Sequence, residues 1–173
     1  MKGEFLLFIN YRQALRFGHV GWGFLCPGTG TYVYGSTDHL YRHQWWDLHG
    51  WIKYMHVPSG EENDWWMERS DKEEMCRLMS EKRFHIRYHA YKSIPVSRPR
   101  PEQAEAMALS YKNGGWSVLS NNCVQQSYEI ARAYGVGPEI LNPWRNSFLL
   151  VPNYWFGRVE GRFVKLRTPT DEL

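Results

Sequence analysis

The sequence predicts an α+β fold, a single domain in which a helix packs on an antiparallel sheet. Segments with strand and helix periodicity follow one another as strand, hairpin, helix, strand, helix, strand–helix and strands, which is not a repeated βαβ series. The length of 173 residues suits one domain with its own core. We therefore expect residues 1–173 to form one domain, with an insertion rich in Trp and His at about 40–69.

Composition narrows the classes of function. The 21 basic and 18 acidic residues are spread along the chain, so we expect no nucleic-acid partner. The three cysteines, Cys26, Cys76 and Cys123, lie far apart without CxxC spacing, which argues against a disulfide framework and a zinc ribbon. The apolar runs are too short for a transmembrane segment and no cleavable signal is visible, so we expect a cytoplasmic protein.

The first elements are a strand and a hairpin. Glu4–Asn10 is apolar enough for a buried strand, and Tyr11–Phe17 reads as a loop or short turn. Two β-rich runs, Gly18–Leu25 and Thr31–Gly35, flank a turn of Pro and Gly residues and predict a hairpin. Glycines 21 and 23 alternate with large residues, so we expect a neighbour to pack closely on one face of the first hairpin strand.

Histidines and tryptophans alternate over residues 38–56. The pair His39 and His43 has the spacing of one helical face, with His49 and His56 downstream, and could bind a metal. An HExxH motif or a nearby cysteine pair is missing, so we favour hydrogen-bonded histidines and expect neither a metal nor a cofactor. The tryptophans of this region either line a recognition surface or belong to the core; they are Trp45, Trp46, Trp51, Trp65 and Trp66.

The second half alternates helices and strands. Residues 70–82 predict a helix capped by Ser70 or Asp71, and residues 84–93 predict a strand with one face exposed to solvent. An extended connector, Pro95–Pro101, leads to a helix that continues to Tyr111. For the C-terminal part we expect one or two strands, from the apolar residues 148–151 and the alternating residues 158–166, and a frayed tail.

Between these elements lies a candidate nucleophile. A short strand, Trp116–Leu119, leads into the polar corner of residues 120–122, and a helix should begin at Cys123 and end at Gly135. The positive end of the helix dipole favours a thiolate in the first turn, which is the form that attacks a carbonyl. The alternative is that Cys123 is a small apolar residue that fills the junction.

A histidine at the start of the hairpin could be the general base. The residue numbers of two residues that face each other across this hairpin should sum to about 56–58. His19 therefore faces positions 37–39, where Asp38 could orient the imidazole and stabilise its protonated form. If the register slips by one, the orienting residue could be Ser36 or His39.

Three motifs resemble the circularly permuted papain-like hydrolases: Gly-His-Val-Gly around His19, Tyr-Gly-Ser ending at Ser36, and Trp-Ser-Val-Leu-Ser-Asn-Asn-Cys ending at Cys123. That group includes permuted NlpC/P60-type peptidases, PPPDE-type peptidases and lecithin–retinol acyltransferase-like enzymes. The resemblance covers residues 17–38 and 110–135 and implies a permuted papain-like fold with Cys123 as nucleophile and His19 as base. The residues after the cysteine, Val124-Gln-Gln, differ from the Glu-His-Phe and Asn-His-Phe of two branches, so no branch is assigned.

The expected function is cleavage of an amide bond in a peptide, isopeptide or peptidoglycan-like substrate through an acyl-thiolate intermediate. Asn122 is a candidate for binding the oxyanion, although helix capping is its simpler role, and Trp22 and Trp116 are candidate substrate contacts. Two alternatives stay open: an acyltransferase or thioesterase acting on lipid-like acyl groups, and a binding module that keeps the fold without activity. The sequence leaves the oligomeric state open.

Overall fold

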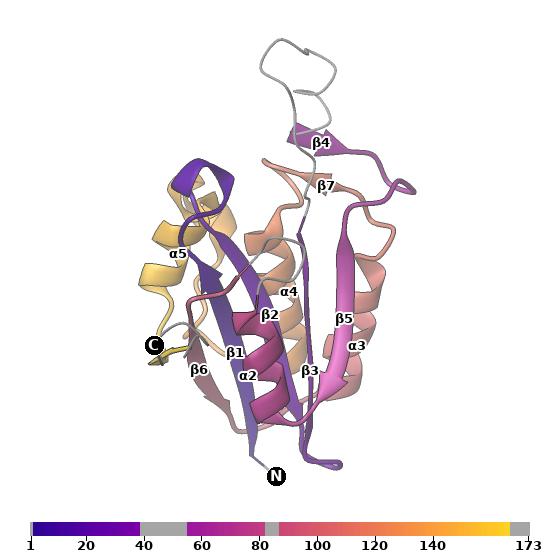
Figure 1. Ribbon diagram of the computed structural model, residues 1–173, viewed down its shortest axis with the longest axis vertical. Coiled ribbons are helices and arrows are strands. Elements are labelled where there is room, and N and C mark those ends of the chain that lie inside the picture. The colour runs from indigo at the N-terminus through magenta and orange to yellow at the C-terminus, as the bar shows by residue number, and fades with distance from the viewer. Residues whose placement is uncertain (1, 39–54, 82–86, 167–173) are drawn as a thin grey trace.

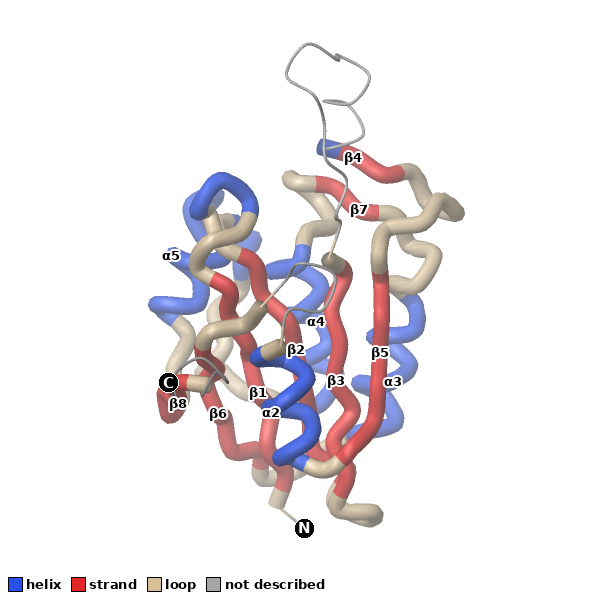
Figure 2. Tube along the Cα trace, in the orientation of Figure 1, coloured by secondary structure: helices blue, strands red, loops and turns tan. Residues whose placement is uncertain are grey.

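The computed structural model describes residues 2–38, 55–81 and 87–166. Its centre is a six-stranded antiparallel sheet with the strand order β5-β3-β2-β1-β6-β8 (Figures 1 and 2). Two further short strands, β4 and β7, pair beyond one end of this sheet. The strands are β1 (Gly3–Asn10), β2 (His19–Cys26), β3 (Thr31–Thr37), β4 (His56–Val57), β5 (Trp65–Ser70), β6 (Ala90–Val96), β7 (Trp116–Ser117) and β8 (Arg162–Lys165).

Helices cover both faces of the sheet, which confirms the predicted α+β class. Successive side chains of β1 point to opposite faces. Phe5, Leu7 and Ile9 belong to a core shared with three helices, whereas Leu6 and Phe8 belong to a second core on the other face. The first core includes side chains of α3 (Pro101–Ser110), α4 (Cys123–Tyr134) and α5 (Pro152–Arg158), and the second includes those of α2 (Lys72–Ser80).

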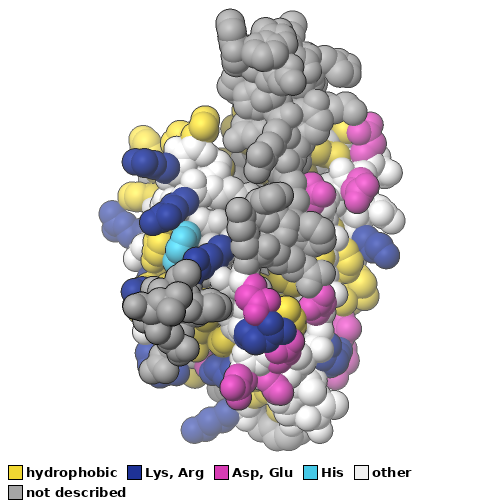
Figure 3. All heavy atoms as spheres, in the orientation of Figure 1, with side chains coloured by type: hydrophobic (Ala, Val, Ile, Leu, Met, Phe, Trp, Pro, Cys, Tyr) yellow, Lys and Arg dark blue, Asp and Glu magenta, His cyan; other side chains and the backbone are white. Residues whose placement is uncertain are grey.

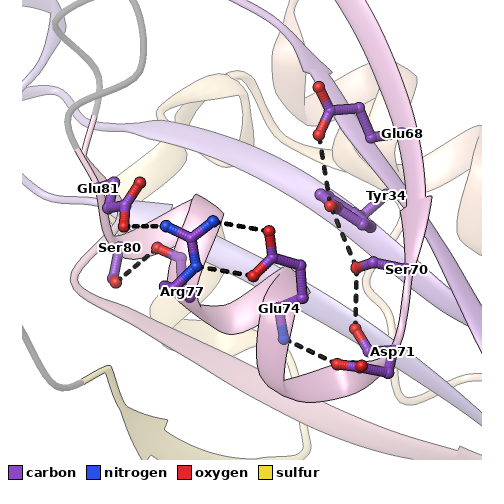
Figure 4. A network of polar contacts seen from close by, with 8 residues as sticks. All are labelled: Tyr34, Glu68, Ser70, Asp71, Glu74, Arg77, Ser80 and Glu81. Carbon is purple, nitrogen blue, oxygen red and sulfur yellow. Dashed lines mark hydrogen bonds and ion pairs between the residues drawn. The ribbon is translucent and has the colours of Figure 1, made fainter.

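A polar network runs along the exposed side of α2 and its N-terminal cap (Figure 4). Asp71 caps the helix by accepting a hydrogen bond of 2.8 Å from the backbone N–H of Glu74, one of the two residues predicted as caps. Arg77 then donates to Glu74 at 2.6 Å and also pairs with Glu81 one turn later. These pairs are half exposed, so solvent screens them and they contribute little to stability.

The hairpin prediction is confirmed, including its register. The residue numbers of every pair between β2 and β3, from Trp22↔Gly35 to Cys26↔Thr31, sum to 57. The close neighbour expected at the glycines is also present. A Cβ atom at Gly21 would lie 2.7 Å from the hydroxyl of Tyr88, and one at Gly23 would lie 3.0 Å from the sulfur of Met75.

Several element predictions are wrong. Residues 65–70 form β5, which the sequence pattern does not predict. Of the one or two strands expected in the C-terminal part, β8 is present at residues 162–165, whereas residues 147–150 form a 3-10 turn, η3. The turn precedes α5, which begins with Pro152 in a first-turn position and was also missed. Strand β6 begins only at Ala90 and includes Pro95. The proline is tolerated because β8 pairs with β6 no further than Ser93, so β6 is an edge strand on that side at Pro95.

Other expectations lie outside the described residues: His39, His43, His49, Trp45, Trp46, Trp51 and the first part of the strand predicted at residues 84–93. Among the described helices, none is both long and apolar enough to cross a bilayer. Two more 3-10 turns complete the chain, η1 (Ala14–Arg16) between β1 and β2 and η2 (Pro143–Arg145) before η3 (Ser147–Leu150).

Candidate active site

Cys123 is the first residue of α4, as the sequence predicts. Asn122 is the N-cap, and its side-chain oxygen accepts from the backbone N–H groups of Val124 at 2.9 Å and Gln125 at 3.1 Å. Gln125 returns the contact by accepting from the N–H of Asn122 at 2.8 Å, which completes a capping box. Gly135 ends the helix with a left-handed φ of 109°. Local sequence therefore places the cysteine sulfur at the positive end of a well-capped helix.

His19 begins β2 and is held by two residues of the neighbouring strand and its end. Its Nε2 lies 2.8 Å from the hydroxyl oxygen of Ser36 and 3.3 Å from Oδ1 of Asp38. The Ser36 hydroxyl lies 3.4 Å from the carbonyl oxygen of Val20, to which it donates, so it can accept from Nε2–H. Two of the alternatives left open by the sequence, Asp38 and Ser36, thus both contact the ring, and the third, His39, lies outside the described residues.

The carboxylate of Asp38 is itself fixed in place. Its Oδ2 accepts a hydrogen bond of 2.7 Å from the indole N–H of Trp66, while Oδ1 faces His19. The backbone N–H of Asp38 donates to the carbonyl of Asp64 at 3.2 Å. The side chains of His19 and Asp38 are 6% and 1% exposed, so their interaction is little screened by solvent.

Cys123 and Asp38 together favour the protonated form of His19. Burial lowers the pKa of the ring, but this is outweighed by the charge of the Cys123 thiolate, by hydrogen bonds with Asp38 and Cys123, and by the charge of Asp38. The net effect raises the pKa of His19 from 6.5 to about 10. Cys123 thus influences the pKa of a histidine that lies 104 positions away in the sequence (123 − 19).

The other two cysteines have no such surroundings. Burial raises the pKa of the Cys26 thiol, although Arg69 donates a hydrogen bond of 3.4 Å to its sulfur. Burial also raises the pKa of the Cys76 thiol. Cys26 is 8% exposed and Cys123 is 6% exposed, so these two thiols differ in their partners and hardly in their access to solvent.

Tyr88 is a neighbour of the site that the sequence did not indicate as functional. Its ring centroid lies 6.0 Å from that of His19, and its hydroxyl occupies the space above Gly21. Burial, followed by the charge of Asp38, raises the pKa of this hydroxyl well above its usual value. The glycine at position 21 was the one signal for a large neighbour, but it could not say which residue supplies it.

The structure gives two of the three predicted substrate contacts a structural role. Trp22 is 2% exposed and stacks on Phe24 with centroids 5.9 Å apart, so it is a core residue. Asn122 is 5% exposed, and its amide nitrogen donates to the carbonyls of Val118 and Leu150 while its oxygen caps the helix. No polar atom of this side chain is left for a substrate. Trp116 is half-buried on β7 next to β4 and keeps its candidacy.

No group of three or more His, Cys, Asp or Glu side chains among the described residues could hold a metal ion. The predicted pair His39 and His43 falls outside that part of the chain. In comparisons with known proteins, neither a family model, nor a curated protein, nor a solved structure gives a significant match to this chain.

Proposed function

We propose that this protein is a cysteine hydrolase that cleaves an amide bond, with Cys123 as nucleophile, His19 as general acid and base, and Asp38 as the residue that orients His19. The observation that carries the proposal is the position of the imidazole, which contacts a buried carboxylate and also a cysteine at a helix N-terminus. Nucleophile, base and orienting group are the three parts that thiol-dependent acyl transfer requires.

The geometry supports a defined role for each ring nitrogen. Asp38 and Ser36 engage Nε2, so the proposal assigns the proton transfers with Cys123 and the substrate to Nδ1. The thiolate attacks the substrate carbonyl and forms a C–S bond, and Nδ1–H of His19 then protonates the leaving nitrogen as the C–N bond breaks. A water molecule, deprotonated by the now neutral His19, hydrolyses the thioester; the acid leaves and the thiolate–imidazolium pair is restored.

The backbone N–H of Cys123 is the donor best placed to stabilise the oxyanion. The N–H groups of Val124 and Gln125 are used by the side chain of Asn122, and that of Gln126 donates to the Asn122 carbonyl. Within the described residues no hydrogen bond uses the N–H of Cys123, so this first-turn donor can face charge that develops beside the sulfur.

The proposal includes the permuted papain-like arrangement. A histidine on an early strand, a cysteine on a later helix and packing of that helix against the histidine's sheet support it. A second candidate function is acyl transfer or thioester hydrolysis on lipid-like acyl groups. It is favoured by exposed apolar side chains, Leu15 and Phe17, in the loop whose Gln13 donates to the backbone carbonyl of Asp38.

Covalent labelling tests the proposal. The protein is incubated with iodoacetamide at neutral pH, and the rate of modification of each cysteine is followed by peptide mass spectrometry. We expect Cys123 to react at least about tenfold faster than Cys26, which is equally buried but lacks an imidazole. His19→Gln should remove the difference. Equal, slow labelling of both thiols in the wild type would contradict the proposal.

The substrate class is tested in the same way. The protein is mixed with amide and acyl-ester substrates of p-nitroaniline and p-nitrophenol, and the mass of the intact protein is measured after rapid acid quench. An acyl adduct on Cys123 that is hydrolysed, and that is absent in Cys123→Ala, would support a hydrolase. An adduct formed only from long-chain esters would support the second candidate. Adduct formation from neither class would count against both candidate functions and favour a binding module.

A further inference from the structure

Exposed apolar side chains are concentrated on two segments, residues 11–17 and 142–158. Ten large apolar side chains of the described residues are exposed, and six of them belong to these segments. The most prominent are Leu15, 76% exposed, and Phe148, 68% exposed. A set of this size, gathered on one part of a surface, is typical of a recognition site rather than of scattered surface residues. The six are Tyr11, Leu15, Phe17, Trp144, Phe148 and Tyr154.

The same segments are basic and contain no acidic residue. Four exposed arginines lie among the apolar side chains, at positions 12, 16, 145 and 158. Neither segment contains Asp or Glu, although the whole chain has 18 acidic residues and a net charge of only +3. Figure 3 shows yellow and dark blue side chains together over η1 and α5, at the upper left, whereas the magenta acidic side chains gather elsewhere on this face. We call the six apolar residues and the four arginines together the docking face.

Hydrogen bonds join the two segments into one surface. The side-chain nitrogen of Asn153 donates to the carbonyls of Tyr11 at 3.2 Å and Arg16 at 2.8 Å, and its backbone N–H donates to Phe17 at 2.9 Å. In Figure 1 the turn between β1 and β2 accordingly lies beside α5. The two segments, more than 120 positions apart in the sequence, therefore present their exposed side chains together.

The turn that carries Leu15 is held in an unfavourable backbone conformation. Ala14, Leu15 and Arg16 have positive φ values of 49°, 55° and 72°. Such a conformation costs roughly 1–2 kcal/mol for each residue with a side chain. It persists here because Asn153 and the bond from Gly18 N–H to the Gln13 carbonyl, 3.0 Å, fix both ends. Strain of this kind is concentrated at functional surfaces, and here it keeps an apolar side chain directed away from the core.

We propose that the docking face binds an anionic membrane surface. Apolar side chains on the tips of turns can enter the boundary between headgroups and acyl chains, and arginines among them can pair with lipid phosphates. Leu15 and Phe148 stand on the short turns η1 and η3. A bilayer accepts such isolated projections because it deforms around them, whereas a folded partner would need a matching cavity for each. The uniform positive charge complements anionic lipid.

The docking face borders the candidate active site on two sides. Gln13, beside η1, donates to the backbone carbonyl of Asp38 at 3.4 Å, and Asn122 donates to the carbonyl of Leu150 in η3 at 3.3 Å. A protein docked in this way would hold Cys123 close to the headgroup layer. Membrane binding does not depend on the proposed catalysis and is tested separately.

The test is a vesicle flotation assay with the full chain. We expect the protein to float with vesicles made of equal parts of phosphatidylcholine and phosphatidylglycerol, and to float poorly with phosphatidylcholine alone. Binding should fall as salt is added, because the lipid charges are screened. Leu15→Asn with Phe148→Ser should weaken binding at least about tenfold; asparagine suits the positive φ at position 15. Arg12→Gln with Arg16→Gln should weaken binding roughly 25-fold, about fivefold for each arginine.

Leu109→Ser is the matched control, since Leu109 is 47% exposed on α3 and lies outside the docking face. It should bind as the wild type does. Each variant is compared with the wild type by circular dichroism, so that a loss of binding is not mistaken for a loss of the fold. Cys123→Ala should still bind vesicles, so a failure of catalysis and a failure of docking can be told apart.

Three results would overturn the proposal: no flotation with either vesicle, equal flotation with both, or docking-face variants that bind as well as Leu109→Ser does. Sedimentation in the absence of lipid adds a fourth. If the wild type is a dimer that the docking-face variants dissociate, and vesicles do not compete with dimerisation, the face serves a second copy of this chain. Binding of an acidic protein that vesicles do not displace would likewise replace the membrane with a protein partner.

Discussion

Replacing Asp38 with Asn should disable His19 while leaving the fold intact. The carboxylate of Asp38 accepts from Trp66 through Oδ2 and faces His19 Nε2 through Oδ1, at 2.7 Å and 3.3 Å. An asparagine of the same shape keeps the bond from Trp66 with its single oxygen, and so turns its NH₂ group towards Nε2. The imidazole would then accept at Nε2 and carry its proton on Nδ1, as a neutral ring that cannot take a proton from Cys123.

The size of the effect follows from the distance. Opposite charges 3.3 Å apart interact by about 5 kcal/mol at an effective dielectric constant of about 20. One pKa unit corresponds to about 1.4 kcal/mol. Loss of the charge therefore lowers the pKa of His19 from its value of about 10, although the Cys123 charge, the largest cause that raises this pKa, remains in place. A weaker imidazolium assists the attack of Cys123 less, so the reaction of this cysteine with an alkylating agent should slow.

The assay is the rate of Cys123 alkylation by iodoacetamide as a function of pH. Asp38→Asn should react roughly 10- to 50-fold more slowly than the wild type around neutral pH. Asp71→Asn is the matched control, because it makes the same chemical change at the cap of α2, where asparagine caps equally well. Superimposable curves for the wild type and Asp38→Asn would refute the reasoning.

Three further predictions concern stability, each measured by urea unfolding. The pKa of His19 is raised in the folded state, so the charge of the imidazolium stabilises the fold fully below pH 6.5. This contribution should be lost as the pH rises through about 10. A His19→Gln variant that loses the same stability over this pH range would contradict the assignment. Gly135→Ala should destabilise the fold by more than about 1 kcal/mol, because φ at this position is +109° and a Cβ atom would lie 2.7 Å from the Arg98 carbonyl oxygen. Gly157→Ala lies in open space within α5, so it should be neutral or stabilise the fold by up to about 1 kcal/mol. Equal effects of the two substitutions would show that backbone conformation does not decide the outcome. Asn122→Ala should cost about 1–2 kcal/mol and Asn122→Asp less, because aspartate keeps the cap; equal losses would mean that the donated bonds and not the cap stabilise this corner.

Local sequence signals determined the parts of the site that depend on neighbours in the chain. Asn122, Gln125 and Gly135 specify both ends of α4, because capping and left-handed termini are decided within one turn of the helix. The hairpin register, in which paired residue numbers sum to 57, follows from the length of the turn and places Asp38 opposite His19. These elements could be predicted before any packing was known.

Tertiary packing alone decided which side chains meet. That Cys123 contacts His19 depends on how α4 packs on the sheet, and no pattern within either segment encodes the distance between them. The same reason explains the errors: Trp22 reads equally well as a substrate contact or a core residue until the neighbouring face of the sheet is known. Strand β5 could not be predicted from its own residues, because its extended conformation depends on pairing with β3, about 30 positions earlier in the sequence. The docking face exists only because Asn153 joins two distant segments, a contact that hydrogen-bonding geometry decides and composition does not.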